Sequence, residues 1–199
     1  EFVKIVAGDK IYLSGSSGSG KSMLLGLIVG VVEGLTFHTG DKNYEAGAFK
    51  NVTVYMSQAE KERITIEGLA LETIFNSEDT DKITELLTLV KLDDWFNDVM
   101  NGDTKKVIDG ISGGQKTRLC LAITLFQIDR SKQLLILDEP DQGLENSLAI
   151  SILKGVFFKY NWMTIIIVDH ICRCSVSHRG FNVFWKMTNR KLDVDRVED

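Results

Sequence analysis

The stretch Gly15-Ser16-Ser17-Gly18-Ser19-Gly20-Lys21-Ser22 fits the pattern G-x-x-x-x-G-K-[ST] of a phosphate-binding loop, or P-loop. Its glycines let successive backbone N–H groups turn toward an anion without Cβ clashes. Residues 9–14 before it have the pattern of a short buried strand, and residues 21–32 after it that of an apolar helix. The alternative interpretation, a flexible Gly/Ser loop, would not require a strand before it and a helix after it. The sequence therefore predicts a strand–loop–helix unit that binds a nucleotide, with Lys21 on its β- and γ-phosphates and the Ser22 hydroxyl on Mg²⁺.

The composition is that of an ordinary globular domain, with 44% hydrophobic and 26% charged residues among 199. The net charge of −5 speaks against a nucleic-acid-binding module, because no basic excess is available to neutralise a phosphate backbone. The longest apolar run, residues 23–32, has about half of the roughly 20 residues that a membrane span requires. The chain starts with Glu1 rather than Met, and we expect it to be part of a longer protein.

Strand-like and helical segments alternate along the chain. Residues 133–137 and 163–168 are continuous apolar runs, typical of strands that helices cover on both faces. Residues 64–100 change to a helical period with two apolar stripes. Further strands are expected at residues 2–6, 35–38 and 51–56, and a terminal hairpin at 181–194. We therefore predict an α/β fold with a mainly parallel sheet, an antiparallel β edge and an inserted helical subdomain.

Two acidic residues, Asp138 and Glu139, follow the apolar run at 133–137. In P-loop nucleotide hydrolases Mg²⁺ sits at the carboxyl end of a buried parallel strand beside the P-loop strand. In that setting Asp138 would hold the metal through water, and Glu139 would orient the attacking water or accept its proton. The alternative is a pair of solvated loop acids, but the apolar run together with the P-loop favours the catalytic interpretation.

Ile111-Ser112-Gly113-Gly114-Gln115 resembles the LSGGQ signature of ATP-binding cassette (ABC) ATPases, with Ile in place of Leu. The other motifs of that family follow in its order. Gln58 matches the Q-loop glutamine, Asp138-Glu139-Pro140 the Walker B strand end, and His170 the switch histidine. Residues 141–145 occupy the D-loop, but Asp141 and Glu145 depart from its usual residues. The resemblance covers nearly the whole chain and implies a P-loop NTPase fold of the ABC type.

The resemblance implies one nucleotide-binding domain over residues 1–199. Residues 1–62 and 112–199 would form a RecA-like α/β core, and about 63–111 the helical subdomain. Two such domains would pair head to tail around two MgATP molecules, each bound by the P-loop of one chain and the signature of the other. The residues implied at this site share contacts with phosphate, metal or water. Ser112, Gly113, Gly114 and Gln115 would contact the γ-phosphate in trans, Gln58 would join Ser22 and Asp138 at the metal, and Lys21, Glu139 and His170 would act in hydrolysis.

The resemblance also implies a function, namely ATP hydrolysis that drives conformational change in a transporter. The partners would be a second nucleotide-binding domain and transmembrane domains, at the cytosolic face of a membrane. The odd number of cysteines, three, agrees with a reducing compartment. Two alternatives remain open at this point. One is a soluble ABC-type clamp on a non-membrane partner, and the other is an assembly module that no longer turns over ATP.

Overall fold

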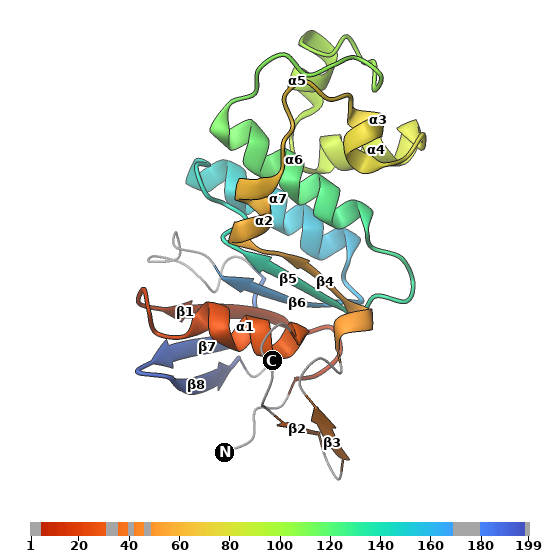
Figure 1. Cartoon of the computed structure of the whole chain (residues 1–199). Coiled ribbons are helices and arrows are strands. Elements are labelled where there is room, and N and C mark those ends of the chain that lie inside the picture. The colour runs from red at the N-terminus through yellow and green to blue at the C-terminus, as the bar shows by residue number, and fades with distance from the viewer. Residues whose placement is uncertain (1–4, 31–35, 40–41, 46–48, 169–179, 198–199) are drawn as a thin grey trace.

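The computed structural model of the chain describes residues 5–30, 36–39, 42–45, 49–168 and 180–197 (Figure 1). Its main sheet has the strand order β4-β5-β6-β1-β7-β8, in which only β8 is antiparallel to its neighbour. The strands are β4 (Thr53–Met56), β5 (Leu134–Asp138), β6 (Thr164–Val168), β1 (Lys10–Gly15), β7 (Val183–Thr188) and β8 (Lys191–Arg196). The predicted parallel sheet with an antiparallel edge is confirmed.

Helices cover both faces of this sheet (Figure 1). α1 (Lys21–Val29) lies on one face, while α6 (Gly113–Phe126) and α7 (Asn146–Lys159) lie on the other. Side chains alternate along a strand, so Leu134 and Ile136 of β5 join the apolar cluster under α1, and Leu135 joins the cluster under α6 and α7. A strand buried on both sides is apolar throughout, which explains the run that the sequence displays.

Three short helices stand beyond α6, at the end of the molecule away from the sheet (Figure 1). They are α3 (Leu71–Phe75), α4 (Thr80–Leu89) and α5 (Asp93–Asp98). α4 begins at Asp79, whose carboxylate accepts a hydrogen bond from the backbone N–H of Lys82 at 3.0 Å. The predicted apolar stripes are buried here, except that Val99 is 43% exposed. They belong to the same apolar cluster as the sheet face under α6 and α7.

The structure corrects several predicted boundaries. Ile5 and Val6 are exposed and lie outside any strand, and residues 2–4 lie outside the described ranges. α1 stops at Val29 because Gly30 caps it in a left-handed conformation, with φ of 76°. A 3-10 turn, η1 (Lys50–Val52), replaces the first part of the strand expected at 51–56. The strand expected at 35–38 is β2 (Thr36–Thr39), which pairs with an unpredicted polar strand, β3 (Lys42–Glu45).

Within the described ranges, none of the helices has both the length and the apolar character needed to span a bilayer. The described elements form three layers, with the sheet between α1 on one face and α6 and α7 on the other, and a helical extension at one end.

Candidate active site

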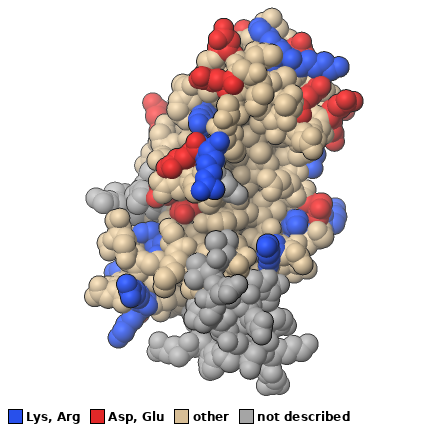
Figure 2. All heavy atoms as spheres, in the orientation of Figure 1, with Lys and Arg blue, Asp and Glu red and all other residues tan. Residues whose placement is uncertain are grey.

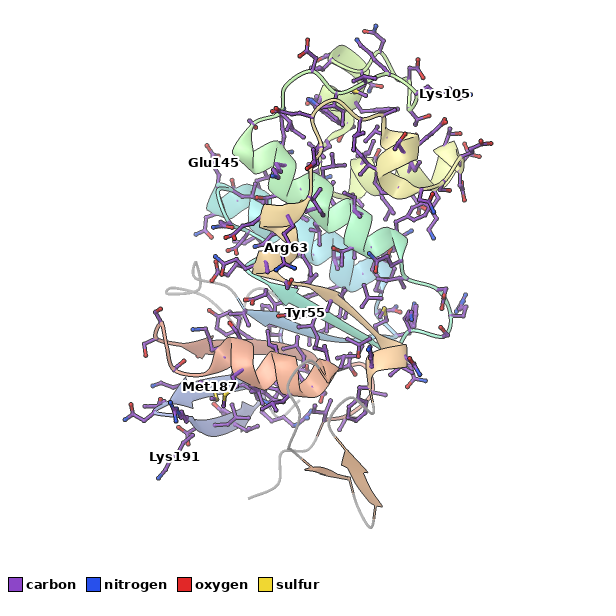
Figure 3. The ribbon with its side chains drawn as sticks, viewed as in Figure 1. Tyr55, Arg63, Lys105, Glu145, Met187 and Lys191 are labelled. Atoms are coloured by element: carbon purple, nitrogen blue, oxygen red, sulfur yellow. The ribbon has the colours of Figure 1, made fainter. Side chains whose placement is uncertain are left out.

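The P-loop joins the carboxyl end of β1 to the amino end of α1. Gly15, Gly18 and Gly20 have φ angles of 153°, 75° and 107°, a region that residues with a Cβ rarely adopt. A Cβ on Gly15 would lie 2.6 Å from the carbonyl oxygen of Met187, which β7 pairs with it in register. Figure 3 shows Met187 at the end of β7, near the start of α1. The glycines therefore permit the tight turn that the sequence predicts.

Two side chains of this loop suit an anion. Lys21 Nζ donates to the carbonyl oxygens of Gly15 at 2.6 Å and Ser16 at 3.1 Å, so its ammonium folds back onto the loop. Ser19 is 6% exposed, and its hydroxyl oxygen has no hydrogen-bond partner among the described residues. A phosphate oxygen would supply an acceptor for both groups at the positive end of α1. The loop therefore fits the phosphate chain of a nucleotide.

A hollow of about 360 Å³ lies over the loop. The P-loop and the β7–β8 turn line it together, through Ser16, Ser17, Gly18, Ser19, Asn189 and Arg190. Asn189 and Arg190 have φ angles of 50° and 63°, as the two central residues of a tight hairpin turn often do. The sequence predicts this turn but not its place beside the P-loop, because that depends on β7 pairing with β1.

The acidic pair lies at the same edge of the sheet as the P-loop, namely the carboxyl edge, where the parallel strands end. Asp138 is the last residue of β5, is 5% exposed and pairs in register with Val168 of β6, the strand next to β1. Glu139 follows with φ of 54°, which is uncommon for a residue other than glycine. Its backbone N–H donates to the carbonyl oxygen of Val168 at 2.7 Å. The structure thus brings the two predicted acids to the edge that carries the P-loop.

Lys61, which the sequence did not single out, packs against this acidic turn. It belongs to α2 (Gln58–Arg63), the helix that follows β4, and is only 7% exposed. Its Nζ donates to the carbonyl oxygens of Asp138 at 2.9 Å and Glu139 at 2.8 Å. Burial lowers the pKa of Lys61, although the carboxylates of Glu139, Asp138 and Asp141 oppose that shift. No local pattern in the polar sequence of α2 marks this lysine as buried.

The signature segment forms the amino end of α6. Ser112 Oγ accepts from the backbone N–H of Gln115 at 3.2 Å, and Gln115 Oε1 accepts from the N–H of Ser112 at 2.9 Å. This reciprocal capping box gives the Ser and Gln of the motif a local structural role. It leaves the hydroxyl proton of Ser112 available as a donor. A Cβ on Gly114 would lie 3.1 Å from the carbonyl oxygen of Gly143, so a glycine suits this close approach.

The predicted residues do not all meet within one chain. In Figure 1 the amino end of α6 lies above α2, whereas the P-loop lies below it. Ser112 and Gly113 are exposed, and so is Gln58 at the start of α2. Glu145, in the D-loop, lies near the amino ends of α6 and α7 (Figure 3). His170 lies outside the described residues.

Comparison with protein families decides the class. The family model described as "ABC transporter" matches residues 3–142 of this chain. The chain belongs to the ABC transporter family. The resemblance predicted from the signature and its companion motifs is thereby confirmed.

Relatives of this ABC protein include ATP-binding proteins and fused permeases. A thiamine import ATP-binding protein of Haemophilus influenzae is 30% identical over 188 residues, which are 84% of this chain and 79% of that protein. A transport/processing ATP-binding protein for lacticin-481 of Lactococcus lactis is 29% identical over 83% of this chain and 24% of its own length. An uncharacterised ABC transporter ATP-binding protein/permease of Saccharomyces cerevisiae is 29% identical, over 86% of this chain and 14% of its own length. This chain thus spans less than a quarter of the last two relatives.

The fold agrees with the family. The crystal structure of an ATP-binding cassette of an ABC transporter, in its ADP conformation, superposes with a TM-score of 0.64 at 21% identity. The match covers 96% of this chain and 81% of that one. The family match confirms the predicted class, an ATP hydrolase, and the structural match confirms its P-loop fold.

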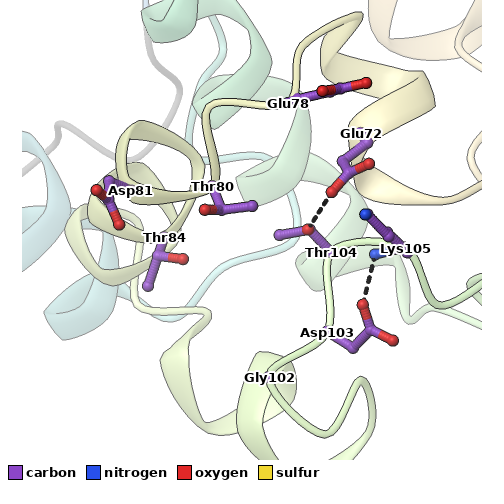
Figure 4. A pocket seen from close by; sticks show the side chains of 9 residues that line it. All are labelled: Glu72, Glu78, Thr80, Asp81, Thr84, Gly102, Asp103, Thr104 and Lys105. Atoms are coloured by element: carbon purple, nitrogen blue, oxygen red, sulfur yellow. Dashed lines mark hydrogen bonds between the residues drawn. The ribbon is translucent and has the colours of Figure 1, made fainter.

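The larger hollow of this ABC protein, about 530 Å³, lies in the helical part (Figure 4). Acidic and hydroxyl side chains dominate its lining, which includes none of the predicted nucleotide-binding residues. Thr104 Oγ1 donates to Glu72 Oε1 at 2.7 Å, and the backbone N–H of Lys105 donates to Asp103 Oδ1 at 2.8 Å. Figure 2 shows basic side chains interspersed with the acidic ones over this end of the molecule. Size alone therefore does not identify the active site.

Proposed function

We propose that this chain binds MgATP on its P-loop and hydrolyses it in a site that the signature segment of a second nucleotide-binding domain completes. The observation that carries the proposal is the exposed amino end of α6. Its first N–H groups lack partners within the helix, and its dipole favours an anion. Yet this end lies apart from the P-loop of its own chain (Figure 1). A nucleotide on the P-loop would reach such a helix end by contact with another chain.

The predicted residues would have different roles around the phosphates, the metal and the attacking water. Gly15, Ser16, Ser17, Gly18, Ser19 and Gly20 would surround the phosphates with backbone and hydroxyl donors, and Lys21 would contact the β- and γ-phosphates. Ser22, Gln58 and Asp138 would hold Mg²⁺, which when bound neutralises charge on the phosphate oxygens. Glu139 would orient the attacking water and accept its proton, and His170 would contact the γ-phosphate. Ser112, Gly113, Gly114 and Gln115 would bind the γ-phosphate from the other chain.

Loss of the γ-phosphate would let the two nucleotide-binding domains separate, and this movement would drive conformational change in the transporter. In this proposal residues 1–62 and 112–199 form the nucleotide-binding core, and about 63–111 form the helical subdomain. The partners would be transmembrane domains of a transporter, with the cassette at the cytosolic face of the membrane. A relative whose name joins an ATP-binding protein to a permease supports this assignment.

A complementation experiment tests the shared site. Lys21→Ala removes the phosphate-binding ammonium, and Ser112→Arg blocks the signature surface, so each variant alone should lose hydrolysis. Mixing the two purified variants should restore it, because a head-to-tail pair would join the intact P-loop of one chain to the intact signature of the other. Phosphate release from MgATP is the measurement. Ser131→Arg, at an exposed serine in the loop before β5, is the matched control and should keep full activity.

Two outcomes would contradict the proposal. If Ser112→Arg alone hydrolyses MgATP at the wild-type rate, the signature segment does not complete a site. If the mixture stays inactive while each variant still binds to the other on size exclusion, the P-loop and signature of paired copies do not form a common site.

A further inference from the structure

The buried lysine of α2 has no role in the proposed hydrolysis. Lys61 lies one helical turn after Gln58, and the backbone N–H of Lys61 donates to the carbonyl oxygen of Ser57 at 3.3 Å. The side chain is 7% exposed, and its ammonium also lies 3.5 Å from Gln142 Oε1. A buried ammonium is costly unless its donors are used, and here two successive carbonyl oxygens use them. The lysine therefore joins the helix that carries Gln58 to the turn that carries Glu139.

The two carbonyl oxygens can converge on one ammonium because the backbone bends at Glu139. In an extended strand successive carbonyls point in opposite directions. Glu139 instead has φ of 54°, and its carbonyl also accepts from the N–H of Gln142 at 3.3 Å. A left-handed conformation is unfavourable for a residue with a Cβ. A cation that binds only this bent form shifts the turn toward it.

Charge supports the same arrangement. The ionisable groups whose charges act most strongly on the ammonium are the carboxylates of Glu139, Asp138 and Asp141. Asp141 is only 3% exposed, so these charges lie in a region where water screens them weakly. The carbonyl dipoles and the carboxylates both stabilise the ammonium at this position.

We infer that Lys61 is a positioning residue for hydrolysis, which holds the backbone of Glu139 in the conformation that places its carboxylate. The inference rests on the proposed role of Glu139 in hydrolysis. Lys61 itself would contact neither phosphate nor water. It fixes the direction of Glu139 from the segment that also positions Gln58.

The test is a set of variants in the intact protein, with kcat and KM for MgATP measured for each. Lys61→Met keeps the length and packing of the side chain but loses the donors, so kcat should fall about tenfold while KM changes less than about twofold. Lys61→Arg keeps the charge and donors and should restore part of the rate. Lys61→Gln, with a shorter amide donor, is measured beside them, so that a failure of Lys61→Met to fold leaves the test intact.

The matched control is Lys10→Met. Lys10 is another buried lysine whose ammonium binds backbone carbonyls, but it lies at the opposite edge of the sheet. Its loss should lower the thermal unfolding temperature and leave kcat within about twofold of wild type. Equal losses of kcat in Lys10→Met and Lys61→Met, both in proportion to stability, would overturn the positioning role.

A double variant separates this inference from the proposed function. If Lys61 acts through Glu139, adding Lys61→Met to Glu139→Gln should not lower the residual rate further. Multiplied losses would overturn the inference while the function stands. A folded Lys61→Met protein with wild-type kcat would do the same. A wild-type protein without any hydrolysis, under conditions in which it binds MgATP, would instead refute the proposed function.

Discussion

The amino and carboxyl edges of the sheet, where the parallel strands begin and end, differ in how far their polar groups are paired. At the amino edge, where the parallel strands begin, Asp9 accepts from Nη1 and Nη2 of Arg196 at 2.8 and 2.7 Å, from Asn182 at 3.2 Å and from the N–H of Val6 at 2.7 Å. The ammonium of Lys10, beside it, lies within hydrogen-bond distance of four backbone carbonyls and shares its three N–H donors among them. Every charged group in this set has partners in direct contact. Such a network stabilises and specifies a fold but offers nothing to a ligand.

At the carboxyl edge, by contrast, a buried hydroxyl has no partner among the described residues and several residues have unusual backbone angles. The hydroxyl of Ser19 is buried without a partner among the described residues, three P-loop glycines have positive φ, and Glu139 shares that region despite its Cβ. Strained backbone and unsatisfied polar groups persist where the surrounding structure holds them, and they are typical of functional sites. The comparison suggests that a change at the amino edge should cost stability, while a change at the carboxyl edge should cost turnover.

The largest expected effect is that of Glu139→Gln. The amide keeps the shape of the side chain but cannot accept a proton, so kcat for MgATP should fall by about 100-fold or more. MgATP binding should persist, and an ATP-bound dimer should accumulate on size exclusion. The rate is measured by phosphate release, with thermal unfolding as the check on folding. A wild-type rate would show that Glu139 is not the base.

Asp9→Asn should affect stability rather than turnover. The substitution removes the charge that pairs with Arg196 and turns one acceptor oxygen into a donor facing other donors. The free energy of unfolding should fall by about 2 kcal/mol, the scale of hydrogen bonds to a charged group. Urea denaturation measures it, with Asp195→Asn, an exposed acid on β8, as the control that should be near neutral. If Asp9→Asn lost activity while keeping its stability, the contrast between the edges would break down.

The pH dependence of stability supplies a smaller effect at the same edge. Burial lowers the pKa of Lys10 from 10.5 to about 8, against the opposing charge of Asp9. Above pH 8 the unfolded chain therefore binds more protons than the folded one, and stability should rise with pH, by at most about 1.4 kcal/mol per unit. Lys10→Met should lack this rise.

The window for that measurement ends near pH 10. Burial raises the pKa of Tyr160 from 10.0 to about 12, so above pH 10 the folded chain holds a proton that the unfolded chain has lost. Stability contributed by Tyr160 then falls as pH rises. Denaturation curves at pH 8 and pH 10 for wild type and Lys10→Met isolate the lysine. An equal rise in both proteins would assign it to another group.

The sequence predicted what local patterns encode. The apolar run at 133–137 identified a doubly covered strand, and the P-loop glycines identified their own turn. Because parallel strands end at a common edge, the sequence also placed Asp138 and Glu139 at the edge that carries that loop. Their strand was expected directly beside the P-loop strand, but β6 lies between β5 and β1. These features rest on periodicity and on the chemistry of single residue types.

Other features depend on contacts between segments far apart in the chain. The partners of Lys61 lie more than 70 residues away, on β5 and its turn. The approach of Arg190 to the P-loop requires β7 to pair with β1. The positive φ of Glu139 has no local signal, because glutamate does not favour it. Charge and residue type alone cannot distinguish such a buried lysine from a solvated one.

The most direct test of the contrast between the edges is equilibrium binding of MgATP, measured by isothermal titration calorimetry on three proteins. Lys21→Ala removes the ammonium of the P-loop, and Lys10→Met removes the buried ammonium at the amino edge. Lys21→Ala should weaken MgATP binding by about tenfold or more, the scale of a charge-assisted hydrogen bond, while Lys10→Met keeps the wild-type affinity. Unchanged affinity in Lys21→Ala, or an equal loss in both variants, would contradict a nucleotide site at the carboxyl edge.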